Sequence, residues 1–260
     1  MEEIAYAKIN LELRVLARRP DGYHELDTLF AFAGDGDRLS VEPGEELSLR
    51  VTGPFAAALG ASEDNLVIRA AKLLGGGRGA ALTLDKRLPV ASGIGGGSAD
   101  AAAALRLLVR WWDLGLGKAE LLALARHLGA DVPACLESRT VRGKGRGDDL
   151  ATEAGTPLQG EPVLLVNPGV AVPTAQVFGR WEGAPARASN DLETPARQIA
   201  PVIGEVIDEL LGQPGARMVG MSGSGATCFG LFDGEERRDR AAATISARHP
   251  HWWQLASRLR

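Results

Sequence analysis

The stretch Pro89-Val-Ala-Ser-Gly-Ile-Gly-Gly-Gly-Ser-Ala-Asp-Ala-Ala-Ala-Ala-Leu105 decides the fold of this chain. Before it, residues 80–85 alternate in hydrophobicity, and after it residues 105–112 carry apolar side chains at helical spacing. The order is therefore a strand, a glycine-rich loop and a helix that begins near Ser98. Glycines let backbone N–H groups approach an anion, and a helix N-terminus adds unpaired donors and partial positive charge. This order predicts a phosphate-binding loop, and the alternative is a flexible loop before an alanine-rich helix.

Two common nucleotide-binding loops are excluded by the spacing of these glycines. A P-loop needs a lysine directly after its last glycine, and none follows here. A dinucleotide fingerprint needs a glycine where Ser98 stands, if counting starts at Gly93. Asp113 lies at a suitable distance for a ribose-binding acid, but it falls at a helix end and not at the tip of a second strand.

The composition of the chain is that of an ordinary globular protein. Its 260 residues are 45% hydrophobic and 24% charged, enough for one large domain or two small ones. A net charge of −4 argues against a nucleic-acid partner. Cys135 and Cys228 lack the spacing of a disulfide framework or metal site, which indicates reduced thiols. We expect a cytoplasmic protein with no membrane segment, because no apolar run approaches about 18 residues and the N-terminus is acidic.

The N-terminal third begins with a clean alternation over residues 5–15. This pattern predicts a half-buried strand whose polar face carries Lys8 and Asn10, where solvent exposure is the usual fate of a lysine. The sequence Pro20-Asp21-Gly22 then predicts a turn that presents Tyr23 and His24 together. On their own, these two residues are expected to be a half-buried aromatic beside a surface histidine.

The next segments predict a hairpin and a capped helix. Residues 38–51 are expected to form the hairpin, with its turn at Pro43-Gly44-Glu45. Asp64 or Asn65 is expected to cap a helix that ends at the glycines of residues 75–77. Lys86 closes the strand before the phosphate loop, where it can belong to a solvated charge pair.

Downstream of the loop helix, residues 121–128 predict another helix, which ends at Gly129. Asp131 follows between small residues, a setting typical of a turn or cap. Beyond residue 156 the pattern is β-α-β-β-α-β, with strands at 162–166, 218–222, 227–232 and 252–259. Helices are expected at 174–181, 199–211 and 235–248.

Several motifs resemble those of the GHMP kinase superfamily, and in particular its 4-diphosphocytidyl-2-C-methyl-D-erythritol kinases. They are the loop Pro89–Ala101, the opening Ala7-Lys8-Ile9-Asn10, the segment Asp21-Gly22-Tyr23-His24 and the run Gly129-Ala130-Asp131-Val132-Pro133. Met221–Thr227 resembles the third motif of the superfamily, a glycine loop packed beside the phosphate loop. The matches span residues 7–232.

The resemblance implies an α+β, two-domain GHMP kinase fold. The N-terminal ATP-binding domain would resemble domain 2 of ribosomal protein S5 and span residues 1–155. The C-terminal domain, residues 156–260, would be ferredoxin-like.

The resemblance also implies the site residues. Lys8 and Asp131 would be catalytic, with Asp131 as acid/base and Lys8 favouring loss of the hydroxyl proton. ATP would be bound by Asn65, Lys86, Pro89, Val90, Ala91, Ser92, Gly93, Ile94, Gly95, Gly96, Gly97 and Ser98. The substrate would be bound by Asn10, Tyr23, His24, Thr174 and Phe178.

These roles imply a kinase that uses ATP with Mg²⁺ to phosphorylate the 2-hydroxyl of a cytidine diphosphate-linked methylerythritol. No protein ligand of Mg²⁺ is identifiable, and the chain would be a monomer or a homodimer. Another GHMP kinase with a different alcohol substrate and a non-catalytic metabolite sensor are the alternatives. The segment Arg142–Asp149 departs from the family pattern, and its positive charges are either exposed or close to substrate phosphate.

Overall fold

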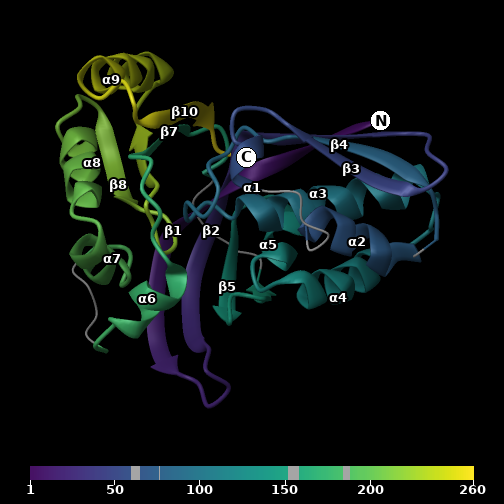
Figure 1. The fold of residues 1–260 in the computed structure, drawn as a ribbon. Coiled ribbons are helices and arrows are strands. Elements are labelled where there is room, and N and C mark those ends of the chain that lie inside the picture. Colours follow the sequence, from purple (N-terminus) through teal and green to yellow (C-terminus); the bar gives the residue numbers. More distant parts are fainter. Residues whose placement is uncertain (60–64, 76, 152–157, 184–187) are drawn as a thin grey trace. The chain divides into compact units, whose positions relative to one another are not determined.

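The computed structural model describes residues 1–59, 65–75, 77–151, 158–183 and 188–260 (Figure 1). The chain forms two compact units that interleave along the sequence. The first comprises Met1–Ala7, Asp35–Val90 and Gly95–Ser138, and the second comprises Lys8–Gly34, Ala91–Ile94 and Arg139–Arg260. The boundary predicted between residues 155 and 156 lies outside the described residues, as does the predicted cap Asp64.

Strands β1 (Glu2–Arg18) and β2 (His24–Glu42) contribute residues to both units. They pair with each other, and the predicted turn at residues 20–22 joins them. Gly22 has a φ of 85°, the left-handed conformation that favours glycine at this place in the turn.

In the first unit, β4 (Ala80–Asp85) lies between β2 and β3 (Leu47–Thr52). It runs parallel to β3 and antiparallel to β2, with Leu82 opposite both Leu49 and Val41. The predicted hairpin of residues 38–51 is therefore wrong, although both of its strands exist. The link between β2 and β3 passes over the start of β4, where a Cβ added at Gly79 would lie 2.0 Å from the Gly44 carbonyl oxygen.

The helices of the first unit pack around α3 (Gly96–Trp111), on one side of β3 and β4 (Figure 1). They are α2 (Leu66–Gly75), α4 (Lys118–Leu128) and α5 (Val132–Glu137), and the short helix α1 (Ala56–Leu59) precedes α2 in the chain. Residues 99–105 of α3 are all buried, and their small side chains allow the close approach of α2 and α5. The helix begins at Gly96, two residues before the predicted start, so Gly96 and Gly97 belong to its first turn.

The second unit contains a β-hairpin and a four-stranded antiparallel sheet. Strands β5 (Val141–Gly145) and β6 (Asp149–Ala151) form the hairpin, and β5 pairs with Leu26–Phe30 of β2. The sheet has the order β10-β7-β9-β8. Its strands are β7 (Pro162–Asn167), β8 (Ala216–Met221), β9 (Cys228–Phe232) and β10 (Trp253–Arg258). This is the β-α-β-β-α-β arrangement that the sequence predicted.

The helices of the second unit are α6 (Thr174–Gly179), α7 (Glu193–Ile199), α8 (Val202–Leu211) and α9 (Glu235–Arg248). Helices α8 and α9 pack against the sheet, and a continuous core lies between them and the strands. The single helix predicted over residues 199–211 is wrong at its start. Pro201 disfavours helical backbone at Ala200, which has φ −133° and ψ 86°, so α7 ends there and α8 begins after the proline.

Candidate active site

The glycine-rich loop presents a helix N-terminus, as the sequence predicted. Gly93 and Gly95 have φ values of 80° and 63°, which a larger residue adopts only at a cost, and Gly95 is the N-cap of α3. The first intrahelical bond runs from the Ala99 N–H to the Gly95 carbonyl oxygen at 2.8 Å. The N–H groups of Gly96, Gly97 and Ser98 therefore have no acceptor within the helix and can serve an anion.

Residues 92 and 93 of the glycine-rich loop contact residues 222–227, which belong to the segment that resembles the third family motif. A Cβ at Gly93 would lie 2.4 Å from the Ser222 carbonyl oxygen, so only glycine fits this close backbone approach. The Ser222 hydroxyl donates to the Gly93 carbonyl oxygen at 2.9 Å, and the Thr227 N–H donates to Ser92 O at 3.1 Å. These bonds confirm the predicted packing of the two loops.

Lys86 lies buried between two carboxylates. Its Nζ donates to Asp37 Oδ2 at 2.5 Å and to Asp100 Oδ2 at 2.8 Å, and its side chain is 1% exposed. Desolvation acts to lower the pKa of Lys86, but the charges of Asp100 and Asp37 outweigh it and the pKa is raised. The expectation of a solvated charge pair is therefore wrong.

Asp100 also has an altered pKa. Burial raises the pKa of this carboxyl to about 7, and the nearby Asp37 charge acts in the same direction, against the attraction of Lys86. Its second oxygen, Oδ1, is buried and has no hydrogen-bond partner within the described part of the chain.

Lys8 and Asn10 are both buried, each only 3% exposed. Their face of β1 is therefore covered, whereas solvent exposure was expected for a lysine there. The Lys8 ammonium donates to Asn10 Oδ1 at 2.7 Å and lies 5.3 Å from the centre of the Phe30 ring. Asn10 in turn donates to Thr28 Oγ1 at 2.8 Å, which fixes its amide. The backbone N–H of Lys8 donates to the Ile94 carbonyl oxygen at 3.0 Å, so the strand also supports the glycine-rich loop.

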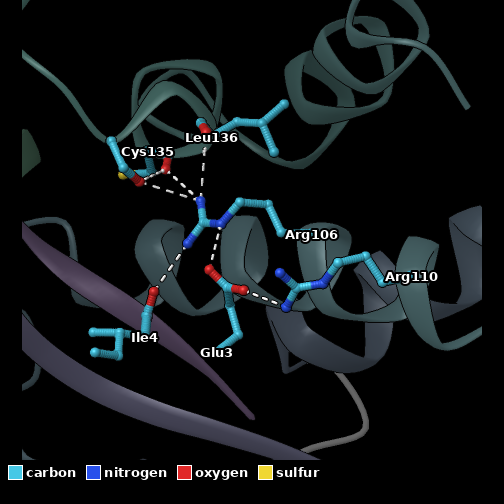
Figure 2. A network of polar contacts seen from close by, with 7 residues as sticks. Glu3, Ile4, Arg106, Arg110, Cys135 and Leu136 are labelled. Carbon is cyan, nitrogen blue, oxygen red and sulfur yellow. Dashed lines mark hydrogen bonds and ion pairs between the residues drawn. The ribbon is translucent and has the colours of Figure 1, made fainter. Parts of the chain in front are cut away.

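Asp131 occupies the N-cap position of α5, without a side-chain capping bond to the helix. The other end of this six-residue helix is fastened by Arg106 (Figure 2). Its guanidinium donates to Cys135 O at 2.8 Å, to Ile4 O at 2.9 Å and to Glu3 Oε1 at 2.8 Å. One arginine of α3 therefore joins the start of β1 to the helix whose N-cap is Asp131.

An aromatic cluster forms between the β1–β2 hairpin and α6. The His24 ring stacks on Phe178 with centroids 4.6 Å apart, and Trp181 meets His24 edge-on at 6.0 Å. His24 Nε2 and the indole N–H of Trp181 are buried and unpartnered among the described residues. Burial and the charge of Arg18 lower the pKa of His24, so near pH 7 its ring is neutral, with one donor and one acceptor.

Three further residues with predicted site roles are Tyr23, Thr174 and Asn65. Tyr23 is 54% exposed, and the Arg146 guanidinium lies 5.2 Å from the centre of its ring. Thr174 begins α6, and its hydroxyl lies 2.9 Å from the hydroxyl of Ser224. Asn65 caps α2 through a bond from the Val67 N–H at 2.9 Å, as expected.

Three residues of these clusters escaped sequence analysis: Asp37, Asp100 and Trp181. Asp100 carried a signal, because it lies within the quoted stretch and would belong to the first turn of the predicted helix. Trp181 follows Phe178 by three positions and lies within the helix predicted over residues 174–181, although α6 ends at Gly179. No sequence pattern pointed to Asp37, because it lies 49 residues before Lys86 in the sequence.

Two negative findings apply to the described residues. They contain no cluster of three or more His, Cys, Asp or Glu side chains that could hold a metal ion. None of the helices they form has the length and apolar character needed to cross a membrane.

Comparison with protein families identifies the class. Residues 65–139 match the GHMP kinases N-terminal domain, and residues 178–251 match the GHMP kinases C-terminal domain. The chain therefore belongs to the GHMP kinase family.

Relatives over the full length define the particular group within it. A protein of Rhizorhabdus wittichii named 4-diphosphocytidyl-2-C-methyl-D-erythritol kinase is 53% identical, over 99% of this chain and 94% of its own length. One of Cereibacter sphaeroides with the same name is 50% identical over 99% of both chains. These relatives confirm the resemblance that the sequence motifs indicated.

Solved structures agree with this assignment. A crystal structure of 4-(cytidine 5'-diphospho)-2C-methyl-D-erythritol kinase matches with a TM-score of 0.82 and 37% identity, and covers 100% of this chain and 99% of its own. A homoserine kinase from Cytophaga hutchinsonii shares the fold, with a TM-score of 0.74 over 99% of this chain and 94% of its own, at only 17% identity.

Proposed function

We propose that this chain transfers the γ-phosphoryl group of ATP to the 2-hydroxyl of 4-diphosphocytidyl-2-C-methyl-D-erythritol, a step of the non-mevalonate isoprenoid pathway. The relatives named for this activity match nearly the whole chain at about half identity. The reaction needs three things from the protein: a site for the triphosphate, a site for the cytidine end, and groups that handle the proton of the hydroxyl.

The observation that supports the cytidine substrate is the aromatic cluster of His24, Phe178 and Trp181. The flat aromatic face of a base stacks on such rings, and the two unpartnered nitrogens offer hydrogen bonds that a base edge can satisfy. Neutral His24 suits cytosine, whose edge carries both a donor and acceptors. We assign Tyr23, Asn10 and Thr174 to the same substrate, as the family motifs imply.

The triphosphate is assigned to residues 89–98, where free N–H groups at the start of α3 meet negative charge. Mg²⁺ would arrive with ATP, held mainly by phosphate oxygens and water, and would neutralise charge on the transferred group. Asn65 caps α2, and its neighbour Leu66 lies beside Gly97, so it belongs to the nucleotide side of this assignment.

Asp131 is assigned to accept the proton of the 2-hydroxyl. Lys8 is assigned to stabilise the negative charge that develops on this oxygen, since a cation near a forming alkoxide lowers its energy. The bond from Lys8 to Asn10 keeps the ammonium in one orientation. We further propose a cytoplasmic enzyme that acts as a monomer or a homodimer.

The test is a coupled ADP-release assay with Mg·ATP and three alcohols: the cytidine-linked substrate, mevalonate and homoserine. We expect turnover with the first alone. Turnover with another alcohol would support the role of the phosphate loop and contradict the assignment of a cytidine site. ATP binding without any turnover would favour a metabolite sensor.

Variants test the two catalytic assignments. Lys8→Ala and Asp131→Asn are each expected to lower kcat by about 100-fold or more, because both act on the reacting oxygen. Full turnover by either variant would overturn its role.

A further inference from the structure

The buried cluster of Asp37, Lys86 and Asp100 lies directly under the N-terminus of α3. Each of its members comes from a different part of the first unit: Asp37 from β2, Lys86 from the residue after β4, and Asp100 from α3, four residues after the helix begins at Gly96. Their side chains are 0%, 1% and 4% exposed. The Lys86 ammonium therefore has almost no surface left for a ligand.

Asp37 binds the chain that leads into the glycine-rich loop. Its Oδ1 accepts from the backbone N–H groups of Arg87 and Leu88, at 2.5 and 2.8 Å, while Oδ2 accepts from Lys86. A single carboxylate thus fixes the main chain on the way into the loop.

The cluster also reaches the loop at its far end. A Cβ built on Gly96 would lie 2.9 Å from Lys86 Nζ, so this ammonium packs against the backbone of the first residue of α3. Asp100, four residues on, binds the same Nζ. Lys86 is therefore pinned between a carboxylate at the loop entry and one at the loop exit.

We propose that Lys86 is a positioning residue, which with Asp37 and Asp100 holds the N–H groups at the start of α3 in place for phosphate, and does not itself bind ATP phosphate. This inference rests on the proposed function of the loop. It replaces the expectation that Lys86 binds the phosphates with its own charge. Burial of an ion pair with a second carboxylate beside it is costly, which is consistent with a role in fixing one backbone arrangement.

Chemical labelling of the native chain separates the two roles without any mutation. The protein is treated briefly with an amine-acetylating reagent, with and without a non-hydrolysable ATP analogue, and lysine modification is measured by mass spectrometry. We expect Lys86 to remain unmodified in both samples, and Lys118, whose side chain is 65% exposed, to react in both. Labelling of Lys86 that the analogue suppresses would overturn the proposal.

Variants give an independent test through the affinity for a fluorescent ATP analogue. Lys86→Met leaves two buried carboxylates without their cation, and we expect it to weaken binding roughly 10- to 100-fold by displacing the loop. Lys86→Met/Asp100→Asn removes one carboxylate, and we expect it to recover at least about half of the lost binding free energy. If Lys86 bound phosphate directly, removing the Asp100 carboxylate could not restore the binding lost with the lysine. A double variant that binds the analogue as weakly as Lys86→Met would therefore contradict the proposal.

The control is Lys72→Met, which removes an exposed lysine of α2 and should leave analogue binding unchanged. The affinity for CDP should also stay unchanged in all these variants. If the native chain binds the ATP analogue but does not phosphorylate the cytidine-linked alcohol, the proposed function fails while the binding tests of Lys86 still stand.

Discussion

Trp181 carries a buried indole N–H that none of the described residues accepts. Leaving such a donor unpaired costs about 1–3 kcal/mol, and a ligand acceptor would remove that cost. His24 Nε2, in the same cluster, is in the same situation. Two unsatisfied nitrogens beside one aromatic ring are therefore better explained by a ligand than by packing.

Trp181→Phe tests this interpretation because it keeps an aromatic ring and removes the N–H. We expect the Kd for CDP, measured by titration calorimetry, to rise about 5- to 10-fold, the equivalent of one hydrogen bond. The affinity for ATP should not change. Trp111→Phe in the first unit is the matched control, and equal CDP affinity in the native chain and Trp181→Phe would contradict the role of the indole.

Asp100 links stability to pH. Burial raises its pKa to about 7, so between its unfolded pKa near 3.8 and this value the folded chain holds a proton that the unfolded chain releases. The free energy of unfolding should therefore fall as pH rises through this window, by at most about 1.4 kcal/mol per pH unit. Asp37 and Lys86 face the same carboxyl and set the extent of the effect.

Asp100→Asn removes this titration. In urea unfolding curves, we expect the free energy of unfolding of the native chain to fall between about pH 4 and 7 relative to that of Asp100→Asn. Asp208→Asn, at an exposed position of α8, is the control and should follow the native curve. Parallel curves for the native chain and Asp100→Asn would show that Asp100 titrates normally.

At the scale of elements, α5 depends on Arg106. A helix of six residues is not stable by itself, so its orientation comes from what it contacts. Arg106 accounts for much of this, since its guanidinium binds two carbonyl groups at the C-terminal end of α5 and the carboxylate of Glu3. Displacement of the helix would also move Asp131 at its N-terminus.

We expect Arg106→Met to lower the free energy of unfolding by about 2–4 kcal/mol. We also expect it to lower kcat by a larger factor than it changes the KM for either substrate. Arg106→Lys should recover part of both losses, because one ammonium can replace only some of the bonds. Arg110→Met is the matched control: it removes the other arginine on Glu3, but its side chain is 53% exposed, so the cost should stay below about 1 kcal/mol. Equal effects of the two methionine variants would exclude a special role for Arg106.

Sequence analysis predicted elements wherever a short period was sufficient. The alternation of residues 80–85 and the helical spacing of residues 121–128 each depend only on neighbours. The strand forms with the expected bounds, and the helix ends at Leu128 as expected but begins three residues earlier, at Lys118. The pairing of β2 with β4 could not be predicted, because residues 38–51 fit a local hairpin equally well and only the path over β4 excludes it.

Burial of charge was similarly hidden. The alternation of residues 5–15 identifies the polar face of β1 but not what covers it: Lys8 is 3% exposed, and its ammonium lies 5.3 Å from the centre of the Phe30 ring, 22 residues away in the sequence. Lys86 is buried because Asp37 and Asp100 converge on it from 49 and 14 residues away. The family motifs nevertheless predict site roles for Lys8, Asn10, His24 and Phe178, and the structure places Lys8 against Asn10 and His24 against Phe178.

For the molecule as a whole, binding of the base should stabilise the second unit, since His24, Phe178 and Trp181 all belong to it. A ligand at 100 times its Kd adds about 2.7 kcal/mol to the free energy of unfolding. In a chain of this size each kcal/mol raises the Tm by about 2–4 °C, so saturating CDP should raise it by about 5–10 °C in scanning calorimetry. At the same CDP concentration, Trp181→Phe should show a smaller shift because its Kd is higher. If CDP left the Tm of the native chain unchanged, the aromatic cluster would not be a cytidine site, and both this prediction and the proposed substrate would be wrong.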